Sequence, residues 1–355
     1  MHFKELPIAY SYGDVLLAPQ HSKINSRSEV DTSAKISDKI TLDIPLISIN
    51  MDSVTGVDMA IAMGKSGGLG LLPRFDPPNI HAEKLAKVKE AGVITAGAVG
   101  CKETSVGRAE ELAKAGADII TLDVAHAQLQ KAIDMTKWLK DRFGNEITII
   151  SGVVGTYEGA MDLFKAGADS VRVGVGPGTI CTTRIKTGHG VPQITAISEC
   201  AKAAREMGKT VLADGGTENS GDIVKGLAAG GSAVIAGYLF AGTDETPEKI
   251  IEVDGVKYKE YNASTSKKAK LSQIEKYKTG KGKTYAIHVE GVESLVPYKG
   301  PVADVLADLM AGVRSGFSYS GALNLEQLWK NARFMRVTQA GLHENNAHNV
   351  LVNTN

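Results

Sequence analysis

The 355-residue sequence predicts an α/β protein, a closed (β/α)₈ barrel. Two observations predict it: eight short apolar runs lie within residues 44–239, and segments with helical periodicity lie between successive runs. Eight alternating units is the number at which a parallel sheet closes into a TIM barrel. An open doubly wound sheet gives the same local signals, but no GxGxxG fingerprint opens the first strand-to-helix turn. The closed barrel is therefore the favoured interpretation.

Five of the predicted strands follow one recurring phrase, in which a helix ends at a small residue and glycine and an apolar run follows. Glycine can adopt the left-handed conformation that ends a helix, and a run without polar alternation is typical of a strand buried on both faces. These phrases occupy residues 64–72, 89–99, 114–124, 165–175 and 228–239. The other three strands are predicted at 44–50, 147–153 and 210–216.

The pattern changes after the eighth strand. Residues 261–283 hold seven lysines and one glutamate, which predicts an exposed, mobile flap insertion, placed at about 255–298. A solvated loop or basic contact patch is the competing interpretation. Helical periodicity at 302–321 and 325–337 is expected to close the barrel, and 340–355 to form a polar tail. We therefore expect one barrel domain over residues 1–355.

Composition limits the classes of function. Forty basic and forty acidic residues cancel, so the overall charge does not favour a nucleic-acid partner. The sequence has no apolar run near the roughly 20 residues of a membrane helix and no signal-peptide pattern at its start. Three cysteines, an odd number, suit a reducing compartment. We expect a cytoplasmic protein with a small-molecule site and no membrane partner.

The loops at the carboxyl ends of barrel strands carry the chemistry in this architecture. After the sixth strand, residues 173–193 hold three glycines and a proline ahead of Cys181. Arg184 and Lys186 follow, and nearby cations lower the pKa of a thiol and so increase its thiolate fraction. This context predicts a nucleophile at Cys181 rather than a buried structural thiol. Cys101 and Cys200 are expected to be inert.

Three other strand ends carry candidate binding groups. Glycine-rich loops after the seventh and eighth strands, at 213–222 and 236–245, predict a phosphate site built from backbone amides. Asp214 could accept ribose hydroxyls or cap a helix, and its position alone does not decide between these roles. Asp123 and His126 follow the fourth strand.

Together these motifs resemble the family of inosine monophosphate (IMP) dehydrogenases and guanosine monophosphate (GMP) reductases, over nearly the whole chain. The segment GVGPGTICTTRIKTGHGVPQITAISECA around Cys181 is long and highly specific. The other segments that carry the resemblance lie at 13–22, 45–72, 208–223, 240–247 and 296–302.

The resemblance implies a purine nucleoside monophosphate as substrate and a nicotinamide dinucleotide, NAD in the dehydrogenase, as hydride partner. Cys181 would attack C2 of the purine and Thr183 would assist proton transfer. The implied substrate-binding residues are Ser53, Thr179, Asp214, Gly216, Gly237, Tyr238, Ser264 and Glu290. Asp123 and Gly174 would face the cofactor. Carbonyls of Gly176, Gly178 and Cys181 would bind potassium, with Glu344 of a neighbouring subunit, in a homotetramer.

The branch of the family is a separate question. The phrases GVPQITA, FAGTDETP and HVEGVESLVPYKG and the tail resemble the dehydrogenase, which we favour, although the regulatory domain pair usual after the second strand is missing. Lys186, the phrase RFD and YKTGKGKT resemble the reductase, but Lys281 stands where the reductase has a catalytic glutamate. Lys276 and Tyr277 are the nearest match to the Arg-Tyr pair with which the dehydrogenase activates water.

Several departures from the family pattern leave other outcomes open. They are Val153 for asparagine, Val124 for a small polar residue, Tyr238 for serine, and residues 262–264 for a GMGS-like loop. A divergent nucleotide-binding relative with weak or no activity is therefore an alternative. A nucleic-acid binder that uses the lysine-rich flap is a third class, and would bind oligonucleotides with a strong salt dependence.

Overall fold

The computed structural model describes residues 6–277 and 289–345. Eight parallel strands form a closed barrel in chain order, and the last strand pairs with the first. All eight strand predictions are confirmed. The strands are β4 (Leu46–Ser48), β5 (Leu69–Leu72), β6 (Ala96–Val99), β7 (Ile119–Asp123), β8 (Thr148–Val154), β9 (Ser170–Val173), β10 (Thr210–Asp214) and β11 (Ala233–Ala236).

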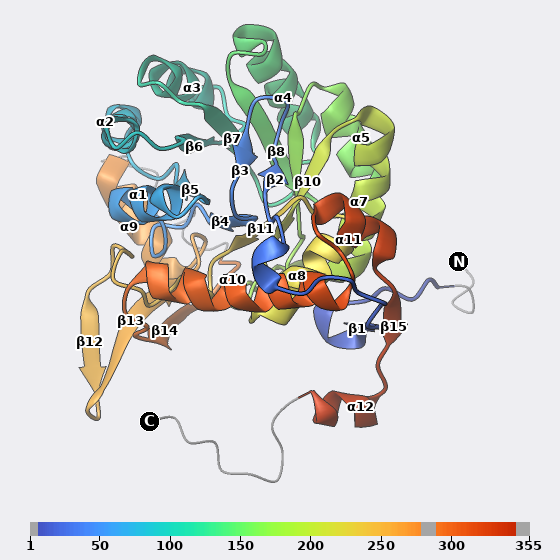
Figure 1. Cartoon of the computed structure of the whole chain (residues 1–355). Helices are drawn as coiled ribbons and strands as arrows, with labels where there is room; N and C mark the ends of the chain where they lie inside the picture. Colours follow the sequence, from blue (N-terminus) through green and yellow to red (C-terminus); the bar gives the residue numbers. More distant parts are fainter. Residues whose placement is uncertain (1–5, 278–288, 346–355) are drawn as a thin grey trace.

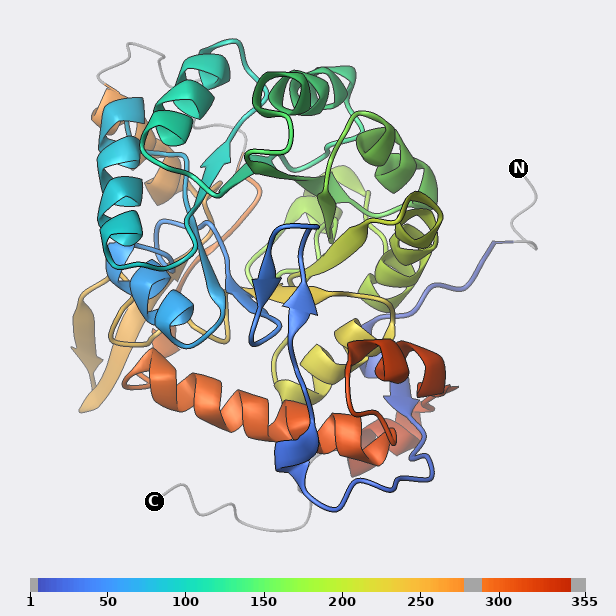
Figure 2. The ribbon, with the colours of Figure 1, turned by 45° about the horizontal axis from the view of Figure 1, so that its top comes forward.

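Helices surround the barrel, as Figures 1 and 2 show. They are α1 (Val57–Lys65), α2 (Pro78–Glu90), α3 (Thr104–Lys114), α4 (Gln130–Phe143), α5 (Tyr157–Lys165), α7 (Gln193–Met207), α8 (Ser220–Ala228) and α10 (Val302–Tyr319). Helix α10 closes the ring between α8 and α1. Inside the barrel, side chains such as Ile47, Leu69, Ile150 and Leu212 are fully buried, so the interior is a packed core.

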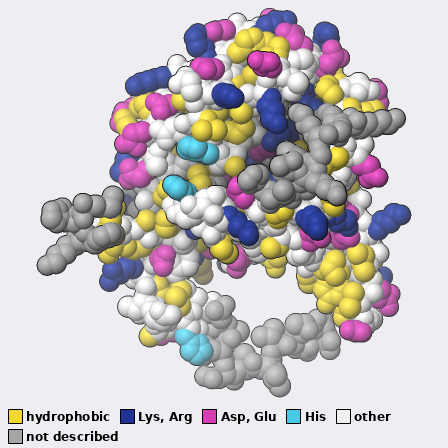
Figure 3. All heavy atoms as spheres, turned by 180° about the vertical axis from the view of Figure 1, so that it is seen from behind, with side chains coloured by type: hydrophobic (Ala, Val, Ile, Leu, Met, Phe, Trp, Pro, Cys, Tyr) yellow, Lys and Arg dark blue, Asp and Glu magenta, His cyan; other side chains and the backbone are white. Residues whose placement is uncertain are grey.

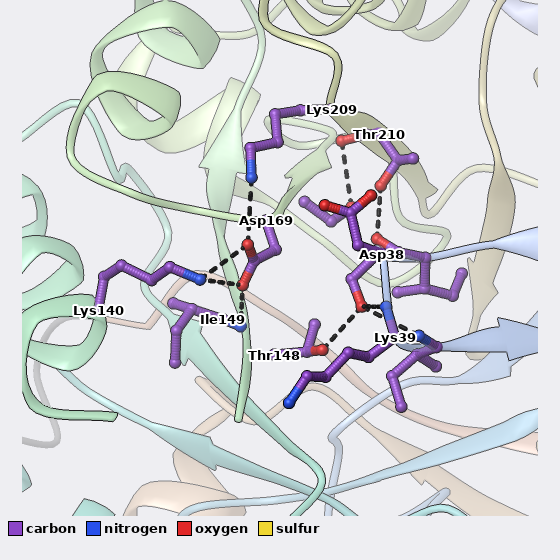
Figure 4. A network of polar contacts seen from close by, with 12 residues as sticks. Asp38, Lys39, Lys140, Thr148, Ile149, Asp169, Lys209 and Thr210 are labelled. Atoms are coloured by element: carbon purple, nitrogen blue, oxygen red, sulfur yellow. Dashed lines mark hydrogen bonds and ion pairs between the residues drawn. The ribbon is translucent and has the colours of Figure 1, made fainter. Parts of the chain in front are cut away.

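A short hairpin covers the amino-terminal end of the barrel (Figure 2). Its strands are β2 (Ala34–Lys35) and β3 (Thr41–Leu42), and Ile36 and Leu42 are buried in the barrel core. Beside it, Asp169 accepts hydrogen bonds from the Ile149 amide and from Lys140 and Lys209 (Figure 4).

Asp118 repeats this arrangement two units earlier in the barrel, where it precedes β7 as Asp169 precedes β9. Its carboxylate accepts hydrogen bonds from the backbone amide and hydroxyl of Thr95 and from Lys89. Asp118 and Asp169 both end the sequence KAGAD, so the recurring phrase places the same link between adjacent strands twice.

The insertion after β11 is more regular than the sequence predicts. Strands β12 (Ile250–Val253), β13 (Val256–Asn262) and β14 (Glu293–Pro297) form an antiparallel sheet, and helix α9 (Lys267–Tyr277) follows β13 (Figure 1). The expectation of a fully exposed segment is wrong for α9, because Lys270 and Gln273 are buried and the Gln273 amide donates to the Ser264 carbonyl. Lys278, Lys281 and Lys283 lie outside the described residues.

The two ends of the described chain meet beside the barrel. Helix α11 (Leu325–Asn331) is as predicted, but Phe334–Arg336 form strand β15, which pairs with β1 (Val15–Leu17) instead of continuing the helix. Helix α12 (Gln339–Glu344) begins the predicted tail, and the rest of the tail, 346–355, is not described.

The surface matches the balanced composition. In Figure 3, basic and acidic side chains are interspersed over the face shown. Among the helices in the described part of the chain, none is both long and apolar enough to cross a bilayer.

Candidate active site

A cavity of about 300 Å³ opens at the carboxyl ends of the barrel strands. All but four of the predicted site residues line it. They are Asp123, Gly174, Gly176, Gly178, Thr179, Cys181, Thr183, Asp214, Gly216, Gly237, Tyr238, Ser264 and Glu290. Residues from far apart in the sequence therefore meet at one edge of the barrel, as the resemblance implies.

Cys181 begins a chain of hydrogen bonds at the cavity wall. Its Sγ donates to Oγ1 of Thr183 at 3.2 Å, and the Thr183 hydroxyl donates to Oε2 of Glu290 at 2.8 Å. Glu290 comes from the segment before β14, and Cys181 pairs with Gly291 in an isolated β-bridge. The chain gives a proton a path between the sulfur and a carboxylate.

Close packing fixes the loop that carries Cys181. A Cβ atom on Gly174 would lie 2.0 Å from the Asp214 carbonyl oxygen, so no larger residue fits there. The Cys181 amide donates to the Gly178 carbonyl at 3.0 Å. Arg184 donates to the carbonyls of Val175 and Val191 and so joins the two ends of the loop.

Four charged side chains form a line of ion pairs across the floor of the cavity. Nε and NH2 of Arg172 donate to Oδ2 of Asp214 at 2.9 and 2.7 Å, and NH1 donates to Asp123 at 3.2 Å. Nε of Arg74 donates to the other oxygen of Asp123 at 3.2 Å. Arg172 and Asp214 are almost fully buried. The guanidinium groups thus fix the orientation of both carboxylates.

The pKa values of the two carboxyl groups shift in opposite directions, because burial and the ion pairs balance differently at each. Burial raises the pKa of Asp214 even though Arg172 lies beside it. Burial also opposes ionisation of Asp123, but Arg172 and Arg74 outweigh it and hold the pKa of Asp123 below its usual value. Asp123 is the more firmly ionised of the two.

The far end of the cavity offers backbone and hydroxyl groups. Gly216 has a φ of +82°, and a Cβ atom there would lie 3.2 Å from Pro177. A Cβ atom on Gly237 would lie 2.6 Å from the Tyr261 hydroxyl. Burial, and then the Asp214 carboxylate, raise the pKa of Tyr261, which therefore keeps its proton as a hydrogen-bond donor. This end suits an anion that accepts neutral donors.

A second cavity, of about 480 Å³, adjoins the first. The two share Ala125, Thr183 and Glu290, and His126 and His189 also line the second. A ligand in the second cavity would therefore contact Thr183 and Glu290, which a ligand in the first cavity also reaches.

Four predicted site residues do not line the Cys181 cavity. The Ser53 hydroxyl exchanges hydrogen bonds with the backbone of Asn262. The Lys276 ammonium lies 2.9 Å from Asp76 and 3.9 Å from Asp52. Glu344 ends α12. The side chain of Tyr277 lies outside the described residues, as does Lys281.

The residues of this cavity that the sequence reasoning missed include Asn50, Arg74, Arg172 and Tyr261. Arg172 had a usable signal, because it is a lone charge within the buried strand SVRV. Asn50 is 3% exposed and its side chain hydrogen-bonds to Asp123, while its Oδ1 has no partner among the described residues.

The Cys181 loop also has the chemistry for a monovalent cation. Among the hydrogen bonds of residues 6–277 and 289–345, none ends on the carbonyl oxygens of Gly176 or Cys181. Carbonyl oxygens are suitable ligands for a hard cation, so these two and Gly178 fit the implied potassium. Within the same ranges, no three His, Cys, Asp or Glu side chains gather as a metal site.

Comparison with known proteins decides the family. The model of the IMP dehydrogenase / GMP reductase domain matches residues 9–348. This chain belongs to the IMP dehydrogenase / GMP reductase family. The IMP dehydrogenase of Nitrosopumilus maritimus is 32% identical to it, over 99% of this chain and 100% of the relative. The enzyme of the same name from Aquifex aeolicus is also 32% identical, over 98% and 97%.

A solved structure from the family has the same fold. It is a cysteine-to-alanine variant of GMP reductase from Trypanosoma brucei in complex with guanosine 5′-monophosphate. It is 29% identical, covers 98% of this chain and 99% of its own, and superposes with a TM-score of 0.93. The alignment with the N. maritimus enzyme runs over 480 residues, 125 more than the 355 of this family member, so that relative has insertions which this chain lacks.

Proposed function

We propose that this protein oxidises IMP to xanthosine 5′-monophosphate, with NAD as hydride acceptor, through a covalent bond between Cys181 and purine C2. One observation carries the proposal: the hydrogen-bonded chain from Cys181 through Thr183 to Glu290, in one cavity with Asp214. Full-length relatives named IMP dehydrogenase support this reaction over the reductase.

In the first half-reaction, the Cys181 sulfur adds to C2 of hypoxanthine. The thiol proton passes through Thr183 to Glu290 along the existing hydrogen bonds. C2 becomes tetrahedral and loses hydride, which leaves a thioimidate on Cys181. A bound nicotinamide ring supplies the acceptor for that hydride. Asp214, held by Arg172, accepts hydrogen bonds from the ribose and keeps C2 beside the sulfur.

In the second half-reaction, water adds to C2 and the carbon–sulfur bond breaks. Once Glu290 has released the first proton to solvent, it accepts a proton from water through Thr183. Xanthosine monophosphate leaves, and the proton on Glu290 returns through Thr183 to the Cys181 thiolate, so the sum is IMP, NAD and water converted to xanthosine monophosphate, NADH and a proton. A role of Lys276 and Tyr277 in activating water stays a prediction, since Lys276 is paired with Asp76.

The remaining sites follow from the same geometry. The dinucleotide would extend from the adjoining cavity into the Cys181 cavity, where Asp123 and Gly174 would contact it, and potassium would bind the carbonyls of Gly176, Gly178 and Cys181. We propose a single catalytic domain without regulatory domains, acting as a cytoplasmic homotetramer in which Glu344 completes a neighbour's cation site. Light scattering would measure the assembly.

GMP reduction is the second candidate, favoured by the likeness to the T. brucei reductase. In that reaction Cys181 adds to C2 of GMP, ammonia leaves, and hydride from NADPH reduces the same thioimidate to IMP. Lys281 stands where the reductase pattern has its catalytic glutamate, and it lies outside the described residues.

The test follows the absorbance of reduced nicotinamide in two reactions. A rise with IMP, NAD and potassium that Cys181→Ala abolishes supports the dehydrogenase, and a fall with GMP and NADPH supports the reductase. Silence in both, with nucleotide binding intact, would contradict both enzymes and leave a binding protein. Mass spectrometry of the intact protein would then be expected to find no purine adduct.

A further inference from the structure

Lys299, in the segment VPYKGPV, is a half-buried cation that the proposed chemistry does not use. Its Nζ donates to the carbonyls of Tyr238 at 2.6 Å and Leu239 at 3.2 Å, and lies 4.6 Å from the centre of the Tyr238 ring. Its backbone amide donates to Gly242. Lys299 therefore holds one short turn, residues 237–242, from one side.

The other side of that turn faces the active-site cavity, which Gly237 and Tyr238 line. A trans peptide directs its N–H opposite to its C=O. Because the Tyr238 carbonyl is directed at Lys299, the N–H of Leu239 is directed away from it, and no described acceptor binds that N–H or the N–H of Tyr238. The amides of Phe240 and Ala241 are occupied, since both donate to the Gly237 carbonyl.

The cations in and behind the cavity differ in whether a carboxylate pairs with them. The two cations that line it, Arg74 and Arg172, are both paired with carboxylates. Lys299 has no carboxylate partner among the ion pairs of the described chain. Burial lowers the pKa of Lys299 to about 8, so its charge is costly while no anion is bound nearby.

Nearby ionisable groups do not supply that anion. Asp244 accepts the hydroxyl of Tyr298, and Glu245 accepts the amide of Val302. Lys259 of β13 is enclosed by the carbonyls of residues 243, 244 and 246, and Tyr261 lies against Gly237.

We propose that Lys299 is a positioning residue for the 5′-phosphate of the substrate: it aligns the turn 237–242 and supplies the positive charge behind it. The inference rests on the proposed function, which places a nucleoside monophosphate in this cavity. The aligned peptide groups lie between the ammonium and the phosphate. Their C=O ends stabilise the positive charge of Lys299 and their N–H ends stabilise the negative charge of the phosphate.

The test compares IMP with inosine, which lacks the phosphate, in binding measured by calorimetry without cofactor. Lys299→Met is expected to weaken IMP binding about tenfold and to leave inosine binding unchanged. Lys299→Arg, which keeps the charge, is expected to restore most of the affinity. Lys257→Met removes an exposed charge from strand β13, next to the segment of Lys299, and is expected to change the affinity for neither ligand.

Equal losses for IMP and inosine, or no loss for IMP, would overturn the inference, because a merely structural role does not select the phosphate. If Lys299→Met fails to fold, Lys299→Gln removes the charge and keeps a donor. If the wild-type protein binds no purine nucleotide, the proposed function fails. Inorganic phosphate then tests the role of Lys299 by itself. Phosphate should still raise the melting temperature of the wild type and not of Lys299→Met, and equal rises would refute the role of Lys299.

Discussion

Removal of Arg172 should destabilise the protein as well as the site. Its side chain is 3% exposed and donates three hydrogen bonds to Asp214 and Asp123. Arg172→Met would leave these two carboxylates facing each other without the cation. Removing one partner of a buried ion pair costs about 3–5 kcal/mol, and we expect a loss of that size in the free energy of unfolding at pH 7.

The loss should depend on pH in a defined direction. Burial already raises the pKa of Asp214 above its unfolded value, and without Arg172 it rises further, so the folded variant binds more protons than the unfolded chain. Its stability then falls as pH rises, and the deficit of Arg172→Met should be smaller at pH 5 than at pH 7. Arg172→Met combined with Asp214→Asn removes both charges and should recover a large part of the loss.

Urea unfolding at the two pH values measures these effects. The control is Arg142→Met, because Arg142 makes a two-bond pair with Glu110 on the surface, and its loss should cost less than about 1 kcal/mol. If Arg172→Met costs no more than this control, or equally much at both pH values, the account of Arg172 as the charge that holds both carboxylates is refuted.

Three further predictions concern the chemistry and the flap. Glu290→Gln should slow turnover about a hundredfold and slow the formation of the thioimidate as well as its hydrolysis, because Glu290 accepts a proton in both steps; thioimidate formation at the wild-type rate, seen as a mass increase of the intact protein, would argue against Glu290 as the acceptor of the thiol proton. Lys276→Gln and Asp76→Asn should lower activity by similar, modest factors in steady-state kinetics, because they break the same ion pair. A much larger loss for Lys276→Gln alone would assign Lys276 to the chemistry. The affinity for IMP should fall above about pH 8, where Lys299 loses its proton. In a calorimetric pH series, Lys299→Arg should remove that fall. The same fall in both proteins would exclude Lys299 as its cause.

The strands and the site loops could be predicted because their signals are local. Each barrel strand lies in a short, mainly apolar run, and the loop before Cys181 is rich in glycine within a few residues. Chemistry at the carboxyl ends of strands then follows from the architecture. Strand order and this rule are enough to place Cys181 and Asp214 at one edge of the barrel, whereas the role of Gly237 was implied by the resemblance to the family.

Features that depend on distant partners could not be predicted. The lysine-rich composition of helix α9 predicts an exposed segment, but Gln273 binds the Ser264 carbonyl and Lys276 binds Asp76. Sequence periodicity cannot predict such contacts. Strand β15 continues a helical pattern and becomes a strand because β1, from the other end of the chain, offers a free edge. The roles of Arg172 and Asn50 depend on which side chains converge on Asp123.

The origin of Glu290 has a consequence for how this enzyme could change. Cys181 belongs to a loop of the barrel, whereas Glu290 belongs to the insertion after β11 and reaches the cysteine through the bridge between Cys181 and Gly291. The proposed bond to the purine would thus be made by one module, and the group proposed to release it is encoded in another. Transplanting residues 248–299 from a relative would be expected to exchange the fate of the shared covalent intermediate, water or hydride, while the barrel that forms it stays the same.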